Sequence, residues 1–96
     1  MSALEDLCRN YRVAFLRYLP RREETALRLG YEIGRAAVVD QVSVLELAQV
    51  HHQVLLEVLR TTEPDEVARI ATAASDFLLE VLAIYDMAHR GILRSN

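Results

Sequence analysis

The chain has 96 residues, of which 52% are hydrophobic, and its formal net charge is −3 at pH 7. This length permits one small domain, because a chain of this size removes only about 60–70% of its unfolded surface from water on folding. The acidic balance argues against non-specific binding of nucleic acid, which requires a basic surface. Few glycines or prolines interrupt the chain, so the composition predicts an all-helical protein.

The first predicted helix covers residues 3–18. Its apolar side chains recur with three- and four-residue spacing, as on one face of an α-helix, while the charged side chains fall on other faces. Pro20 should end this helix, because proline lacks an amide hydrogen and disfavours helical backbone at the residue before it. Proline also suits the first turn of a helix, so we expect the second helix to follow at once.

The second predicted helix covers residues 21–40, and the side chains of its inner stripe are small. The stripe consists of Ala26, Gly30, Ile33, Gly34 and Ala37. Each glycine in a helix interior costs roughly 0.5–1 kcal/mol relative to alanine. The two glycines either let another helix of the same protomer approach closely or line the seam of a dimer.

The third predicted helix covers residues 44–60. Ser43–Glu46 has the sequence of a capping box, in which the serine hydroxyl and the glutamate carboxylate each accept a hydrogen bond from the other residue's amide. His51 falls on the apolar face, where we interpret it as a hydrogen-bonded core histidine rather than a metal ligand. His52 lies about 100° further round the helix, so the two imidazoles cannot bind one metal ion from the same face.

The fourth predicted helix covers residues 64–90, begins after capping and acidic residues, and ends near Gly91 as a C-cap. It carries two apolar stripes. The first stripe recurs at about seven residues and consists of Val67, Ile70, Ala71, Ala74, Phe77, Leu78, Val81, Tyr85, Ala88 and Ile92. The second, called the outer stripe below, consists of Leu79, Ala83 and Met87, with Ile84 beside it.

A helix that is apolar over so much of its circumference must be buried on two sides. In so small a chain, we expect the second side to belong to another molecule. The predicted architecture is therefore a four-helix protomer with a long C-terminal helix, associating as a helical-bundle homodimer. The residues assigned to packing between helices or between protomers are Gly30, Gly34, Ala74, Phe77, Val81 and Tyr85.

Signals for catalysis or metal binding are weak throughout the sequence. Asp86 and His89 have the i, i+3 spacing of metal sites in helical bundles, but such sites also need inward glutamates on facing helices. Glu46 and Glu57 flank the apolar face of their helix instead. The sequence therefore predicts no catalytic residue, no cofactor and no metal ion for this chain.

The cysteine usage and the hydropathy pattern bear on the cellular compartment. Cys8 is the only cysteine, which excludes an intramolecular disulfide and leaves no zinc-ligand spacing. The N-terminus lacks the basic and then apolar pattern of a signal peptide, and no run approaches the ~20 apolar residues of a membrane span. We therefore expect a cytoplasmic protein with no membrane or nucleic-acid partner.

Several segments in order along the chain resemble the N-terminal domain of RsbU-type phosphatases. The segments that carry the resemblance are Arg17–Leu19, Glu24–Leu27, Gly34–Arg35 through Val50–His52, Val54–Leu55, Phe77–Val81 and Tyr85–Ala88. No single segment is a signature. The ordered set spans nearly the whole chain, and its last two segments are similar to the final helix of that domain.

The resemblance implies a non-catalytic, helical homodimer that recruits a switch serine kinase resembling RsbT. That contact would activate an attached PP2C-type serine phosphatase, which controls an anti-anti-sigma factor in the general stress response. Residues 1–96 would then form one dimerisation and docking domain at the N-terminal end of a longer phosphatase. The docking residues that the resemblance implies are Glu24, Arg28, Leu79 and Ala83.

Arg28 departs from the family pattern, because it is charged where an aromatic contact would be expected. The partner can therefore be a different kinase, or there can be none. In a purely structural dimerisation module or a stand-alone adaptor, self-association would use the outer stripe. A small-molecule or metal-binding bundle would instead require a polar, occupied core around His51 and His89.

Overall fold

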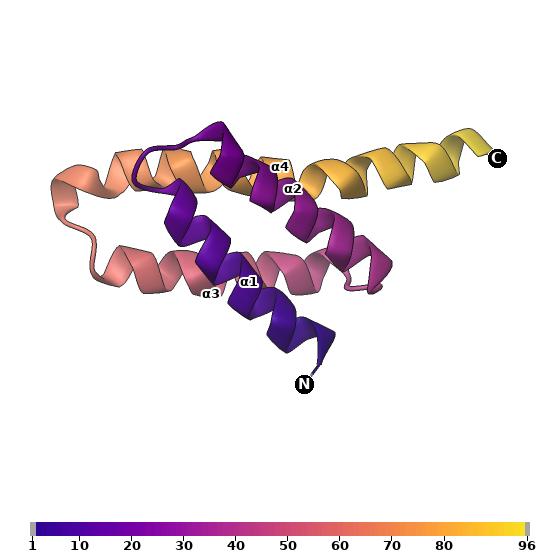
Figure 1. The fold of residues 1–96 in the computed structure, drawn as a ribbon, viewed down its shortest axis with the longest axis horizontal. Helices are drawn as coiled ribbons and strands as arrows, with labels where there is room; N and C mark the ends of the chain where they lie inside the picture. The colour runs from indigo at the N-terminus through magenta and orange to yellow at the C-terminus, as the bar shows by residue number, and fades with distance from the viewer. Residues whose placement is uncertain (1, 96) are drawn as a thin grey trace.

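The computed structural model describes residues 2–95, and it describes side chains for residues 2–88. It contains the helices α1 (Ala3–Tyr18), α2 (Glu24–Val39), α3 (Val44–Arg60) and α4 (Val67–Ser95), with the 3₁₀ helix η1 (Pro64–Glu66) before α4. Residues 2–95 include no strand, so the predicted all-α, four-helix fold is confirmed. Figure 1 shows two layers, in which α1 and α2 cross the antiparallel pair formed by α3 and α4.

The second helix begins at Glu24 rather than at the predicted residue 21. Residues 19–23 form a turn in which Arg22 has a φ of 52°. The Arg22 amide donates to the Tyr18 carbonyl oxygen at 2.8 Å. Because left-handed backbone is uncommon for a residue other than glycine, it interrupts the helical path expected directly after the proline.

Two arginines tie this turn to α4. The guanidinium group of Arg22 forms an ion pair with Asp76, and Arg69 donates to the Leu19 carbonyl oxygen at 3.0 Å. These contacts join residues that are 54 and 50 positions apart in the sequence, so they could not be read from local patterns. They fix the direction in which α2 leaves the turn.

The fourth helix also differs from its predicted bounds. Its first turn is the separate 3₁₀ helix η1, and α4 then runs from Val67 to Ser95. The prediction of a C-cap at Gly91 is wrong, since the helix continues through this residue and no glycine in the described part of the chain has a positive φ. A glycine inside a helix destabilises it by only roughly 1 kcal/mol relative to alanine, so the helix can continue through this position. The side chains of His89 and Ile92 lie outside the described residues.

An aromatic cluster forms the centre of the core. Tyr11 and Phe15 of α1 and Phe77 of α4 are fully buried. The Phe77 ring meets the rings of Tyr11 and Phe15 edge to face, at centroid distances of 5.2 and 5.5 Å. Such contacts stabilise beyond the area that they bury. The first stripe of α4 thus packs into its own protomer at Ile70, Ala74, Phe77 and Val81.

The predicted capping box at the start of α3 is confirmed. The Ser43 hydroxyl accepts from the Glu46 amide at 3.1 Å, and the Glu46 carboxylate accepts from the Ser43 amide at 3.4 Å. Both bonds satisfy amides that would otherwise lack an intrahelical partner. The cap therefore defines where the α2–α3 connection ends.

The C-terminal part of α4 extends past the other helices (Figure 1). The molecule is accordingly elongated, with principal extents of 48, 29 and 21 Å. None of the helices, over the residues that the structure describes, is long and apolar enough to cross a membrane.

Candidate docking surface on α2 and α4

The surface that carries the predicted docking residues rests on a close contact between α2 and α4. A Cβ atom added to Gly34 would lie 2.0 Å from the carbonyl oxygen of Val81, which is far inside van der Waals contact. One added to Gly30 would lie 3.1 Å from the Phe77 ring. Both glycines thus face α4 of their own chain, and their missing side chains let the two helices pack closely.

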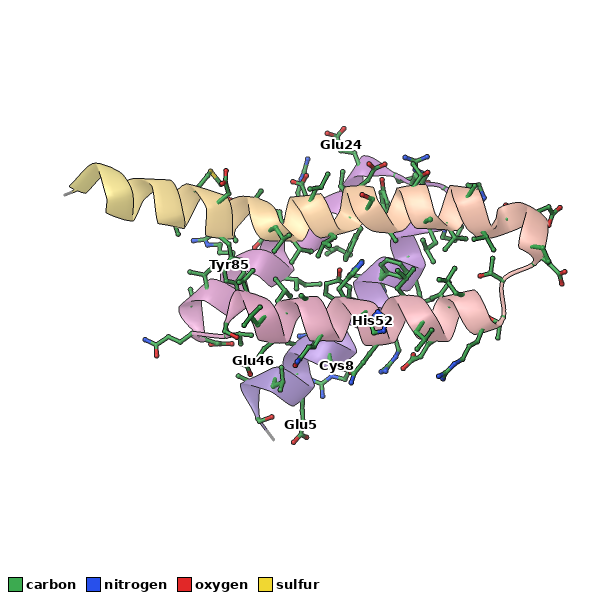
Figure 2. All side chains as sticks on the ribbon, turned by 180° about the vertical axis from the view of Figure 1, so that it is seen from behind. Glu5, Cys8, Glu24, Glu46, His52 and Tyr85 are labelled. Carbon is green, nitrogen blue, oxygen red and sulfur yellow. The ribbon has the colours of Figure 1, made fainter. Side chains whose placement is uncertain are left out.

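Tyr85 fixes the other end of this contact. Its hydroxyl group donates to the carbonyl oxygen of Val42, in the α2–α3 connection, at 2.7 Å. Figure 2 shows the Tyr85 side chain directed from α4 toward this connection. Partial burial, with a smaller contribution from the charge of Glu46, raises the pKa of Tyr85, so the hydroxyl stays protonated as a donor. The bond secures α4 near the point where it leaves the bundle.

A shallow hollow of about 350 Å³ lies between the outer sides of α2 and α4. The residues that line it are Glu24, Leu27, Arg28, Tyr31, Glu32 and Glu80, and they define the α2–α4 hollow. It therefore contains two of the predicted docking residues, Glu24 and Arg28. Figure 2 shows Glu24 projecting away from the bundle at this edge.

The predicted docking residues on α4 lie beside the hollow and do not line it. Leu79 is 64% exposed, Met87 is 50% exposed, and Ala83 is half-buried. Ala83 follows Glu80 by three residues, so the two are neighbours on the helix surface. The outer stripe therefore continues the hollow across the exposed side of α4 as one surface.

Four residues that line the hollow were not among the predicted docking residues: Leu27, Tyr31, Glu32 and Glu80. Tyr31 and Glu80 are the two that the sequence could have indicated. Tyr31 follows Arg28 by three residues and Glu24 by seven, a spacing that places all three on one side of a helix. Glu80 comes directly after Leu79. Both positions could have been inferred once the four docking residues were assigned, but only the structure shows that they meet in the same hollow.

Titratable groups of α1 and α3 have partners on each other's helix. A hydrogen bond of 2.6 Å joins the Tyr11 hydroxyl and Nδ1 of His51. Burial, and to a lesser extent the charge of His52, lowers the pKa of His51, so its imidazole is neutral near pH 7. Glu57 accepts two hydrogen bonds of 2.9 Å from Arg12, and these bonds lower the pKa of its carboxyl group. The predicted hydrogen bond of His51 is thus present, but the side chain is half-buried beside the aromatic cluster rather than enclosed in the core.

These features define an all-helical interaction domain: a packed aromatic core, closely joined α2 and α4, and an exposed surface that is partly apolar and partly charged. Residues 9–88 match the family model of the N-terminal domain of the phosphoserine phosphatase RsbU. The chain therefore belongs to this family, which confirms the resemblance seen in the sequence. The family is a non-catalytic, regulatory domain that acts through protein interaction. No curated protein and no solved structure matches the chain.

Proposed function

We propose that this chain is a dimeric docking domain that binds a switch serine kinase resembling RsbT on the surface formed by the α2–α4 hollow and the outer stripe. Binding there would activate an attached PP2C-type serine phosphatase that controls an anti-anti-sigma factor in stress signalling. The observation that supports this proposal most is Leu79, a large apolar side chain that is 64% exposed beside the hollow. Burial of such a side chain contributes about 1.5–3 kcal/mol.

The chemistry of the surface favours a protein partner. An apolar centre surrounded by charged side chains is typical of interfaces, where the apolar anchors supply most of the affinity. Three carboxylates of the hollow, on Glu24, Glu32 and Glu80, face a single guanidinium group, that of Arg28. The kinase is therefore expected to bring a surface with surplus basic residues, which would raise the rate of association.

Tyr31 lies close to Arg28, the residue that departs from the family pattern because it is charged where an aromatic contact is expected. The Tyr31 side chain is half-buried and lines the hollow with Arg28. It offers an aromatic face near the position where the family pattern has an aromatic contact. We therefore propose that Tyr31 supplies the aromatic contact and that Arg28 pairs with an acidic group of the kinase.

The path of α4 suggests how docking could reach an attached phosphatase. The outer stripe lies on the same helix that extends past the bundle toward the C-terminal end of the chain (Figure 1). A helix is a stiff connector, so a partner that holds its exposed side can change the position of a domain that follows it. α4 would then serve as both docking surface and connector.

The proposal is tested by titrating the purified chain with the RsbT-like kinase encoded in the same genome, using calorimetry. Leu79→Asp should weaken binding at least tenfold and leave the helical content and the molar mass unchanged. Leu45→Asp is a matched control, because Leu45 is 73% exposed but lies on α3. Unchanged binding by the Leu79 variant would refute the docking surface. Conversion of that variant to a monomer would favour the purely structural dimerisation module.

A further inference from the structure

Thr25 lies in the first turn of α2, and its side chain is exposed. It borders a hollow of about 480 Å³ between the end of α1 and the start of α2, called the turn hollow here. The residues that line the turn hollow are Arg17, Pro20, Arg21, Glu23, Thr25, Ala26 and Leu29. The proposed docking function uses none of these residues, because its surface lies on a different side of α2.

Two guanidinium groups share the turn hollow with the Thr25 hydroxyl. Within the described residues, Arg17 has no ion-pair partner. Arg21 pairs with Glu23 at 3.6 Å, and the Arg21 side chain is 82% exposed. An ion pair this exposed contributes little to stability. Both guanidinium groups can therefore bind a more highly charged anion formed beside them.

We propose that Thr25 is a phosphorylation site and that Arg17 and Arg21 hold the phosphate group once it is attached. The modifying enzyme is a protein serine/threonine kinase that uses ATP. The Thr25 hydroxyl oxygen attacks the γ-phosphorus of ATP, the bond from this phosphorus to the β,γ-bridging oxygen breaks, ADP leaves, and the hydroxyl proton passes to a base of the kinase. The product carries a charge of about −1.5 to −2 at pH 7 and three acceptor oxygens, which suit guanidinium donors.

The first turn of α2 is held weakly enough for a kinase to reach Thr25. In the structure, the N-cap residue Glu23 makes no side-chain capping bond. A missing cap destabilises a helix end by about 1 kcal/mol, so this turn opens more readily than the middle of the helix. Arg21 and Arg22 precede the acceptor by four and three positions. Charge patterns of this kind are among the features by which kinases select their substrates.

The phosphate group would connect three parts of the fold. Arg17 belongs to α1, Arg21 to the turn, and Thr25 to α2. Phosphorylation would therefore fix the position at which α2 begins. The inference goes beyond the proposed function, since it requires no partner on the α2–α4 hollow.

Mass spectrometry of the protein isolated from the cells that encode it tests the modification. Trypsin cuts after Arg22 and Arg28, so the peptide of residues 23–28 contains Thr25 as its only hydroxyl side chain. We expect this peptide in a phosphorylated form. Its absence from both growing and stressed cells would overturn the proposal. That result would leave the Leu79→Asp titration unaffected, so the two failures are distinguishable.

The chain synthesised with phosphothreonine at position 25 tests the pairing with the arginines. Its Tm should exceed that of the unmodified chain by about 4 °C or more. Phosphorus NMR should show a lower pKa for the phosphate group than in the urea-unfolded chain, because nearby guanidinium groups favour the dianion.

The same increase in Tm is then measured in three variants. Arg17→Gln and Arg21→Gln should each lose at least half of it. Arg35→Gln should keep it, because Arg35 is an exposed residue of α2 that lies outside the turn hollow. An equal increase in all three variants would overturn the assignment of the phosphate group to the turn hollow. An equal increase in the unmodified chain on addition of inorganic phosphate would identify a site for free anions and overturn the proposal.

Discussion

Substitution of Gly34 by alanine tests the contact on which the α2–α4 surface rests. The new Cβ atom would lie 2.0 Å from the Val81 carbonyl oxygen, so α4 must move away from α2. Overpacking of this kind costs typically about 1–3 kcal/mol, while alanine is favoured over glycine in a helix by roughly 0.5–1 kcal/mol. We therefore expect Gly34→Ala to lower the free energy of unfolding by about 1–2 kcal/mol.

Gly30→Ala is the matched control. Gly30 lies on the same helix as Gly34, and alanine has the same helical advantage over glycine at both positions. The new Cβ atom at position 30, however, would meet the edge of the Phe77 ring at 3.1 Å rather than a backbone oxygen. A ring can shift by a few tenths of an ångström, so this variant should differ from wild type by less than about 1 kcal/mol.

Urea unfolding followed by circular dichroism, at one fixed protein concentration, measures both variants. A difference of 1 kcal/mol corresponds to about 4–8 °C in Tm for a domain of this size. Equal stability of Gly34→Ala and Gly30→Ala would contradict this prediction. That result would mean that α2 and α4 do not approach each other as described.

Three further variants probe single contacts. Tyr85→Phe removes the hydrogen bond to the Val42 carbonyl oxygen and should cost about 0.5–1.5 kcal/mol in urea unfolding; no loss would show that water replaces the hydroxyl. Ser43→Ala should cost about 1 kcal/mol by removing the cap of the Glu46 amide, measured as a lower Tm. Because the pKa of His51 is lowered on folding, the unfolded chain binds protons more readily, so the free energy of unfolding should fall as pH drops from 7 through about 6.5. His51→Gln should flatten this pH dependence. A variant whose free energy of unfolding depends on pH as in wild type would show that His51 is not the source.

Local patterns in the sequence were sufficient to predict the helices and much of their burial. The first helix and the third have the predicted bounds, and the Ser43–Glu46 cap is present. These features depend on contacts within one or two helical turns. The bounds that differ depend on distant contacts instead, since the turn before α2 is tied to α4 through Arg22 and Arg69.

The docking surface likewise depends on contacts between residues that are distant in the sequence. Family resemblance named Glu24, Arg28, Leu79 and Ala83, and helical spacing separated Leu79 and Ala83 from the core-facing stripe. Neither could show that Glu80 completes a hollow with Glu24 and Arg28, because residues on two helices meet only after those helices have packed.

The sequence by itself determined the all-α class, the number of helices and the family, because apolar periodicity, caps and ordered motifs are properties of neighbouring residues. It also showed that α4 has more apolar surface than one face can bury. Only the tertiary structure decided that Gly30 and Gly34 serve the α2–α4 contact within the protomer and that Leu79 remains exposed. The physical reason is that a missing side chain permits close approach, while the fold decides which helix makes that approach.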